Sequence, residues 1–388
     1  MKNRKLLHIP GPTPVVRTIQ DQMGRETVAF TDKAFIASFL ELLQNLKAVA
    51  QTQGEVFVIA GSGTLAMEMA VANTLQHSDS ALVVSHGFFG DRFVQIMERR
   101  GLQVDVLASP WGTTVSLDDI EKKLAEKEYR ALAVTHVDTS TGVKAQIEEI
   151  GRIVHRYPKT LFIVDGVCAT AAEPESMDVM DIDILFTGSQ KAFGVSPGLF
   201  MLWASSNAME RRKSLGRIPD YYLDFENWLP MMHDPSKYFA TPAINMVWAL
   251  AEATRLILQE GLSDRWARHH IMANAIHSAL ETLGLFILAE PSCRSSTVTC
   301  VLYPQNLDDQ FRSILNEEGL VVAAGIGHYR GKAFRIGHMG NIDVHDLVAL
   351  VASLERALNS AGHLSQMGMG VSSLLHSLKK NASEHKKW

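Results

Sequence analysis

The stretch "EVFVIAGSGTLAMEMAVANTL" (residues 55–75) joins an apolar run of strand length to a glycine-containing loop and then to a helix-like segment. The same alternation of apolar runs and amphipathic segments continues to residue 205. Because continuous Val/Ile/Leu runs between helices are typical of strands buried on both faces, they predict an α/β fold with a mostly parallel seven-stranded sheet between helices. The apolar runs are residues 55–60, 81–86, 103–109, 131–138, 160–167, 181–189 and 198–205.

The pattern changes after about residue 250. A long helical stretch is followed by shorter β-rich segments and a further helix, which predicts a second, smaller α+β domain. We divide the chain into an N-terminal segment (1–20), a large domain (21–255), a small C-terminal domain (256–360) and a tail (361–388). The polar end of the tail predicts either a mobile segment or a weakly held helix.

Composition narrows the class of protein. Of the 388 residues, 46% are apolar and 20% are charged, which is the balance of an ordinary globular protein. The net charge of −5 and the lack of a basic stripe argue against a nucleic-acid partner. The apolar runs are too short to span a bilayer, and no apolar signal region precedes Pro10. Three scattered cysteines fit reduced thiols, so we expect a cytoplasmic protein without a membrane partner.

Three polar features follow predicted strands: the loop "AGSGT" (60–64), Asp165 and Lys191. Glycines let the backbone approach an anion, and the N-terminus of a helix offers free N–H groups. A carboxylate at the end of a buried strand is costly unless it has a partner. Because ligands of parallel sheets lie at the carboxyl ends of the strands, the three features are expected to converge there. Together they match the needs of pyridoxal 5'-phosphate, namely a phosphate cradle, a partner for the ring nitrogen and an amine.

Each feature alone has a simpler interpretation. The loop could be a tight turn, Asp165 could cap the segment after it, and Lys191 could be a surface lysine with a buried stem. A dinucleotide site is disfavoured because the loop lacks the full G-x-G-x-x-G spacing. A metal site is disfavoured because no His/Cys/Glu set with ligand spacing accompanies Asp165.

Motifs along almost the whole chain carry a family resemblance. They include "GSGTLAMEMA", "HGFFGDR", "THVDTSTGV", "IVDGV", "TGSQKAFGVSPG", "YFATPAINMVWAL" and "FRIGHMG". In these motifs and their order the sequence resembles the class V pyridoxal-phosphate aminotransferases, and within them the alanine–glyoxylate and serine–glyoxylate group. The resemblance implies a fold-type I enzyme that forms homodimers with shared active sites. It also implies ping-pong transfer of an amino group from alanine or serine to a 2-oxo acid such as glyoxylate.

The resemblance further implies roles for individual residues. Lys191 would bind the cofactor covalently, Asp165 would pair with the ring nitrogen, and Arg335 would bind the substrate carboxylate. Gly11, in the N-terminal segment, would lend backbone groups to the substrate pocket. The other cofactor contacts would be Gly63, Thr64, Phe89, Thr139, Val167 and Gln190, with Tyr238 and Thr241 reaching the site of the partner subunit.

One stretch departs from the family pattern and leaves the amino donor open. Ala29, Phe30 and Thr31 replace the residues that are more usual near the substrate. Two other functions remain as alternatives: a lyase such as a cysteine desulfurase of the same fold, and a catalytically silent cofactor-binding subunit. The first is disfavoured because no cysteine lies in an evident Gly/Ser-rich loop. The second is disfavoured because Lys191 and Asp165 are both present.

Overall fold

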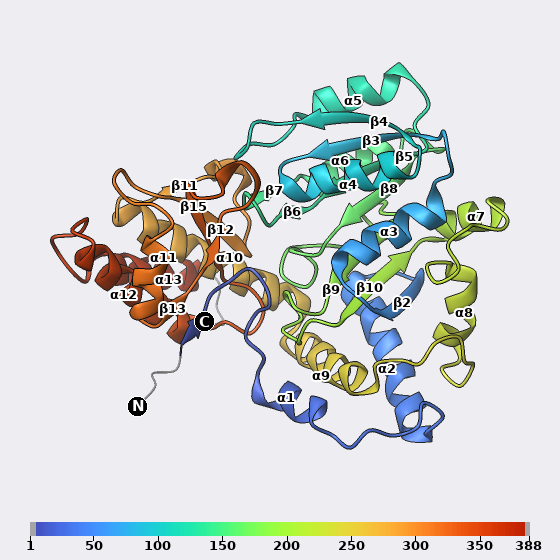
Figure 1. Ribbon diagram of the computed structural model, residues 1–388, viewed down its shortest axis with the longest axis horizontal. Coiled ribbons are helices and arrows are strands. Elements are labelled where there is room, and N and C mark those ends of the chain that lie inside the picture. The colour runs from blue at the N-terminus through green and yellow to red at the C-terminus, as the bar shows by residue number, and fades with distance from the viewer. Residues whose placement is uncertain (1–4, 385–388) are drawn as a thin grey trace.

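The computed structural model describes residues 5–384. Residues 1–4, which begin the expected N-terminal segment, and residues 385–388, which end the expected tail, lie outside the described residues. Figure 1 shows a larger part built around a twisted sheet and a smaller part beside it, which contains the C-terminal helices.

The larger part is organised by a sheet with the strand order β2-β10-β9-β8-β5-β3-β4. Strand β10 runs antiparallel to both of its neighbours, and the other neighbouring strands run parallel. The prediction of a mostly parallel seven-stranded sheet is therefore confirmed. The strands are β2 (Glu55–Ala60), β3 (Ser80–Ser85), β4 (Gln103–Ala108), β5 (Ala131–Thr135), β8 (Leu161–Asp165), β9 (Ile184–Gly188) and β10 (Leu199–Ala204).

The central strands of this sheet are apolar on both faces, and helices cover the sheet so that these strands are buried along their whole length. Helix α3 lies against β8, β9 and β10, whereas α4 lies against β3, β4 and β5. The helices of this part are α1 (Arg17–Met23), α2 (Lys33–Ala50), α3 (Gly63–Thr74), α4 (Phe88–Arg99), α5 (Leu117–Glu126), α6 (Ile147–Val154), α7 (Ser206–Ser214), α8 (Phe225–His233) and α9 (Ile244–Glu260).

The smaller part has its own core and an antiparallel sheet of order β11-β12-β15-β14. Helix α13 packs along α10, where Leu374 is fully buried. The elements are α10 (Leu262–Thr282), β11 (Phe286–Ile287), η1 (Pro291–Cys293), β12 (Val298–Leu302), α11 (Phe311–Glu317), β14 (Ala323–Ala324), η2 (Gly327–Tyr329), β15 (Ala333–Gly337), α12 (Val344–Ser360) and α13 (Met369–Glu384).

Two short pairings lie near the junction of the two parts. Strand β1 (Leu6–Leu7) pairs in parallel with β13 (Leu320–Val321), so the start of the described chain is bound to the small domain. The chain then crosses back to the large domain through residues 8–16 (Figure 1). Beyond β5, strands β6 (Val137–Asp138) and β7 (Val143–Lys144) form a hairpin.

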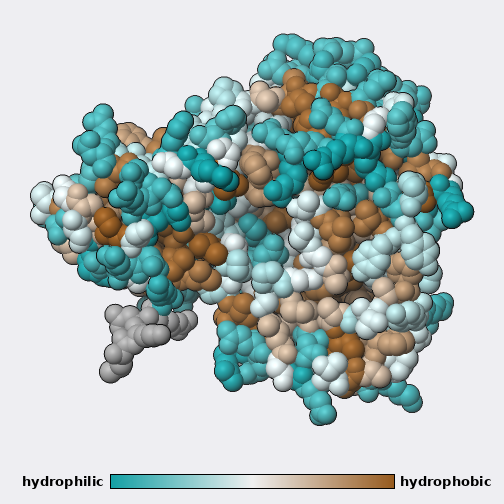
Figure 2. Space-filling model, viewed as in Figure 1, coloured by the Kyte–Doolittle hydropathy of each residue, from teal (hydrophilic) through white to brown (hydrophobic). Residues whose placement is uncertain are grey.

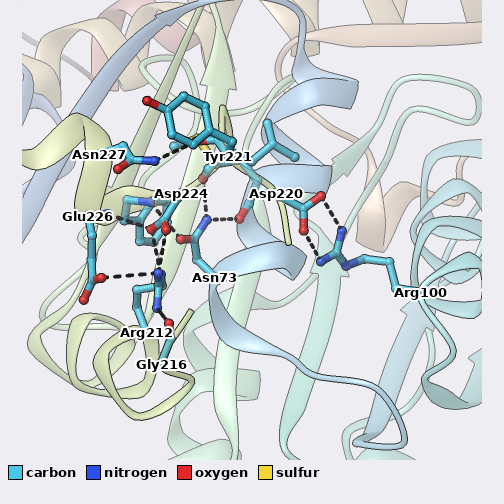
Figure 3. Close-up of polar contacts among 12 residues, drawn as sticks. Asn73, Arg100, Arg212, Gly216, Asp220, Tyr221, Asp224, Glu226 and Asn227 are labelled. Atoms are coloured by element: carbon cyan, nitrogen blue, oxygen red, sulfur yellow. Dashed lines mark hydrogen bonds and ion pairs between the residues drawn. The ribbon is translucent and has the colours of Figure 1, made fainter. Parts of the chain in front are cut away.

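The segment between α7 and α8 is fixed to the large domain by polar contacts (Figure 3). Arg212 forms a two-bond ion pair with Asp224, at 2.8 and 2.6 Å, and Arg100 forms another with Asp220, at 3.1 and 2.6 Å. The Asn73 side chain donates to the Leu223 carbonyl oxygen at 2.7 Å. This segment leads through α8 to residues 234–243.

No helix among residues 5–384 is long and apolar enough to cross a membrane.

Candidate active site

A cavity of about 310 Å³ lies at the carboxyl ends of the central strands. Its walls come from the N-terminal segment, the starts of α3 and α4, the ends of β8 and β9, and strands β14 and β15 of the small domain. Most of the residues predicted for the site line this one cavity. They are Gly11, Gly63, Thr64, Phe89, Thr139, Asp165, Val167, Gln190, Lys191 and Arg335.

Lys191 follows β9 and lines the cavity. The turn that carries it is held by Thr13, whose Oγ1 donates to the Lys191 carbonyl oxygen at 2.7 Å and whose amide donates to the Gln190 oxygen at 3.0 Å. The side chain is buried, and burial lowers the pKa of its amine. A lowered pKa increases the fraction of neutral amine, which is the nucleophilic form.

Gly11 lies directly against this lysine. Its φ of +141° is strained for any other residue, and a Cβ here would lie 2.8 Å from Lys191 Cδ and 2.9 Å from Cε. Glycine therefore leaves the room that the lysine side chain occupies. Gly11 lines the cavity close to the amine, and its role toward the substrate stays a prediction.

Asp165 ends β8 and is buried at the floor of the cavity. Among the described residues, its carboxylate accepts one hydrogen bond, from the Val167 amide at 2.9 Å. Burial raises its pKa to about 7, helped by the negative charges of Asp138 and Glu175 and opposed by the Val167 amide and the Lys191 charge. A buried carboxylate in this state is stabilised by a cationic partner, and a protonated ring nitrogen is such a partner.

The start of α3 forms a cradle for an anion. The first helical hydrogen bond runs from the Ala66 amide to the Ser62 carbonyl oxygen at 3.1 Å, so the amides of Gly63 and Thr64 have no helical acceptor. A Cβ on Gly63 would lie 2.8 Å from Val167 Cγ2, which shows how closely α3 approaches the end of β8. Free amides at the positive end of a helix favour a phosphate group.

Arg335 on β15 brings a guanidinium from the small domain into the cavity. Its Nε donates to the Ala324 oxygen at 2.8 Å and its Nη1 donates to the Thr139 oxygen at 3.0 Å. No described carboxylate forms an ion pair with it, and burial lowers its pKa. Arginine stays charged in proteins, so its remaining N–H groups are free to bind a substrate carboxylate.

Phe89 is placed by the buried carboxylate of Asp138. The amides of Phe89 and Gly90, at the start of α4, donate to Asp138 Oδ2 at 2.9 and 3.3 Å. The Phe88 amide donates to Ser140 Oγ at 3.1 Å. These contacts fix the first turn of α4, so the Phe89 ring lines the cavity.

Tyr238 and Thr241 do not line the cavity. They lie between α8 and α9, where the Tyr238 side chain is 61% exposed and its hydroxyl lies 3.3 Å from Thr241 Oγ1. The ring of Phe30, from the stretch that departs from the family pattern, lies 5.2 Å from the Tyr238 ring. Within one chain these three residues are therefore separate from the site.

Several residues that border the cavity or hold its walls were not singled out by the sequence. Arg92, Ser62, Cys168 and Ile326 line it, and Thr13 supports the turn of Lys191. Arg92 had a usable signal, because it follows Phe89 by three positions and such residues share a helix face. No group of three or more potential metal ligands occurs among the described residues.

The chain matches the family model described as aminotransferase class V over residues 24–334. It is 35% identical to an uncharacterized aminotransferase of Methanocaldococcus jannaschii, covering 92% of this chain and 94% of that protein. It is 33% identical to a protein named soluble hydrogenase, small subunit, of a Synechococcus strain, covering 94% and 95%. It is 31% identical to an L-aspartate–glyoxylate aminotransferase of Paracoccus denitrificans, covering 96% and 95%.

A solved structure is also similar. The alanine–glyoxylate aminotransferase of a Nostoc species superposes with a TM-score of 0.88 at 32% sequence identity, covering 92% of this chain and 96% of that one. The family implies pyridoxal 5'-phosphate as its cofactor. The residues present fit that group, because free amides of α3, an unpaired buried carboxylate and a buried amine border one cavity. The family match and these relatives show that this chain belongs to the class V aminotransferases.

Proposed function

We propose that this aminotransferase moves the amino group of a small monocarboxylic amino acid, alanine or serine, to glyoxylate in two half-reactions at one site. The observation that carries the proposal is the convergence of Lys191, Asp165 and Arg335 on a single cavity. When bound, pyridoxal 5'-phosphate takes up the amino group of the donor and later releases it to the acceptor.

Three residues of the cavity have different roles in the proposed reaction. The guanidinium of Arg335 binds the substrate carboxylate and fixes the orientation of Cα. The amine of Lys191, buried and with a lowered pKa, can accept the proton of Cα. The carboxylate of Asp165 would pair with the ring nitrogen of the bound cofactor and would favour its protonated form.

The charges in the cavity support a donor with one carboxylate. Among the described residues that line it, the cationic side chains are Lys191, Arg335 and Arg92. Lys191 and Arg335 have the roles given above. Arg92 contacts Thr64 at the phosphate end of the cavity, so the described residues that line the cavity offer no further cation for a second substrate carboxylate.

Glyoxylate as the acceptor is supported by the names of relatives. Both the Nostoc and the Paracoccus proteins are named glyoxylate aminotransferases, although their donors differ. The hydrogenase name of another relative fits the alternative of a non-catalytic subunit. The cavity supports amino transfer instead, because a lysine, an aspartate and an arginine with suitable surroundings all border it.

The site also supports a homodimer with shared active sites. Tyr238 and Thr241 are exposed in one chain, and Tyr221 and Tyr222 in the preceding segment are 75% and 42% exposed. Figure 2 shows apolar patches within the hydrophilic surface of the large domain. We propose that residues 238–241 reach the phosphate end of the partner subunit's cavity.

The test uses the purified holoenzyme with alanine, serine or aspartate as donor and glyoxylate or pyruvate as acceptor. We expect glycine to form from glyoxylate with alanine or serine, with parallel lines in double-reciprocal plots. Lys191→Ala should lose both the visible absorbance of the lysine-bound cofactor and the reaction. Transfer to pyruvate alone would refute the glyoxylate part, and an active Lys191→Ala variant would refute the site.

A further inference from the structure

The guanidinium of Arg92 is a charged group of the cavity to which the proposed function gives no catalytic step. Arg92 lies on α4, and its Nη1 donates to Thr64 Oγ1 at 2.9 Å. Its Cζ lies 4.9 Å from the centroid of the Phe89 ring and 5.1 Å from that of Phe88. Among the described residues, no carboxylate forms an ion pair with it.

The bond to Thr64 determines what the threonine hydroxyl can do. A hydroxyl has one proton to donate and two lone pairs that accept. Because Arg92 donates to Thr64 Oγ1, one lone pair is occupied and the hydroxyl proton stays available for another acceptor. Thr64 lies in the first turn of α3, beside the free amides that form the anion cradle.

Arg92 also adds a positive charge where the cradle would hold an anion. Hydrogen bonds to ionised groups are stronger than those between neutral groups. The same guanidinium lies over the Phe89 ring, so one side chain connects the phosphate end of the cavity with the ring that borders the rest of it.

We propose that Arg92 is a positioning residue for the cofactor phosphate, which it serves by orienting the Thr64 hydroxyl as a donor and by adding positive charge to the cradle. The proposal rests on the proposed function, since it requires pyridoxal 5'-phosphate to bind at Lys191. It assigns Arg92 to the cofactor and not to a second carboxylate of the substrate.

The experiment compares two probes that differ only in the phosphate. Apoprotein is titrated with pyridoxal 5'-phosphate and with pyridoxal, and the visible absorbance of the lysine-bound form reports binding. In Arg92→Gln we expect affinity for pyridoxal 5'-phosphate to fall about tenfold to a hundredfold, as for loss of a hydrogen bond to a charged group. Affinity for pyridoxal should stay within about twofold, because pyridoxal lacks the phosphate.

Arg99 provides the matched control. It lies seven positions further along α4, on the same helix face; it borders a neighbouring cavity that Arg92 and Thr64 also line, but it does not line the cofactor cavity. Arg99→Gln removes the same charge from the same helix. Both probes should then bind within about twofold of wild type, since the site itself is unchanged.

A double-mutant cycle tests whether Arg92 acts through Thr64. Thr64→Val removes the hydroxyl and should also weaken pyridoxal 5'-phosphate selectively. If the two residues act together, Arg92→Gln combined with Thr64→Val should bind only slightly more weakly than the worse single variant. Fully additive losses would refute the part of the proposal that runs through Thr64.

The outcomes separate this proposal from the proposed function. If Arg92→Gln binds both probes as wild type does, or loses only affinity for aspartate, the proposal is overturned and the proposed cofactor site stands. If neither probe modifies Lys191 in wild type, the proposed function itself fails. Should Arg92→Gln not fold, Arg92→Lys and Thr64→Val carry the test, and Arg92→Lys should show a smaller loss because it keeps the charge.

Discussion

The carboxylate of Asp165 links the chemistry of the site to the stability of the apoprotein. Its ordinary pKa of 3.8 is raised to about 7 in the folded chain, first of all by burial. The folded protein therefore holds the proton more tightly than the unfolded chain does. By linkage, this residue lowers stability progressively as the pH rises from 3.8 to about 7, and it has no such effect at lower pH.

Asp165→Asn should remove this pH dependence. We expect the stability of the variant apoprotein, relative to wild type, to increase by on the order of 2–3 kcal/mol between pH 5 and pH 8. The measurement is urea unfolding of both apoproteins at the two pH values. Added pyridoxal 5'-phosphate should stabilise wild type more than the variant, because only the carboxylate can pair with the ring cation. A difference that does not change with pH would contradict the assignment.

Arg335→Lys should separate substrate binding from the later chemistry. The planar guanidinium of Arg335 contacts two backbone oxygens and still has N–H groups for a carboxylate. Lysine keeps the positive charge, but its ammonium group cannot make all of these contacts at once. We expect the KM for alanine to rise about tenfold to a hundredfold, with a smaller fall in kcat. Initial rates at saturating glyoxylate measure both constants. Arg330→Lys, an exposed change outside the cavity, is the control, and an unchanged KM in Arg335→Lys would remove Arg335 from the site.

The residues of the site differ in how far the sequence could place them. Asp165 ends β8, Lys191 follows the adjacent parallel strand β9, and Gly63 follows β2 on the other side of β10. The sheet alone therefore brings the three residues to one edge. The surroundings of Arg335 could not be predicted in this way. Its partners, Thr139 and Ala324, come from distant parts of the chain, and their meeting depends on how the small domain packs.

At the scale of elements, burial explains why the sequence predicted the positions of the strands but not the direction of β10. Continuous apolar runs identified the strands of the large sheet, but they did not reveal that β10 runs antiparallel. All six of its residues are buried, as in a parallel central strand, so its hydrophobic pattern carries no direction. Direction is set by the connection from β9 through Lys191, which is too short for a crossover helix.

The ion pairs Arg212–Asp224 and Arg100–Asp220 differ in burial and therefore in the expected cost of breaking them. The Arg212 and Asp224 side chains are 1% and 13% exposed, whereas those of Arg100 and Asp220 are 25% and 24% exposed. Asp224→Asn should cost about 3 kcal/mol, because it leaves the buried Arg212 charge with only the more distant and half-exposed carboxylate of Glu226, at 3.4 Å. Asp220→Asn should cost about 1 kcal/mol or less.

Urea unfolding of the two variants provides this comparison. Asp224 is also the N-cap of α8, but asparagine is as good a helix cap as aspartate, so the loss reports on the ion pair (Figure 3). Equal costs for both substitutions would show that burial of the pair does not matter.

For the whole molecule, the site depends on the packing of two cores. The large core and the small core are separate groups of buried side chains. The cavity lies between them, and the segment after β1 crosses from one to the other (Figure 1). The sequence places the domain boundary at residues 255–256; we propose that it lies somewhat later, between Ile257 of the large core and Met272 of the small core.

The exposure of Tyr238 and Thr241 leads to a prediction for the assembled protein. If these residues complete the site of the partner subunit, a subunit lacking Lys191 can still complete its partner's site. Lys191→Ala should be inactive alone, and the double variant Tyr238→Ala/Thr241→Ala should be strongly impaired. After the two are unfolded together and refolded in equal amounts, half of the dimers are mixed and each has one intact site. We expect about a quarter of the wild-type activity.

The control for this experiment is a mixture made without unfolding, in which the subunits have not exchanged and activity should stay low. Gel filtration of the refolded mixture verifies the dimer. Shared sites predict a gain on mixing because each mixed dimer combines an intact Lys191 with an intact Tyr238 from different chains. If each chain instead completed its own site, no mixed dimer would contain an intact site, and the refolded mixture would show only half the activity of the double variant.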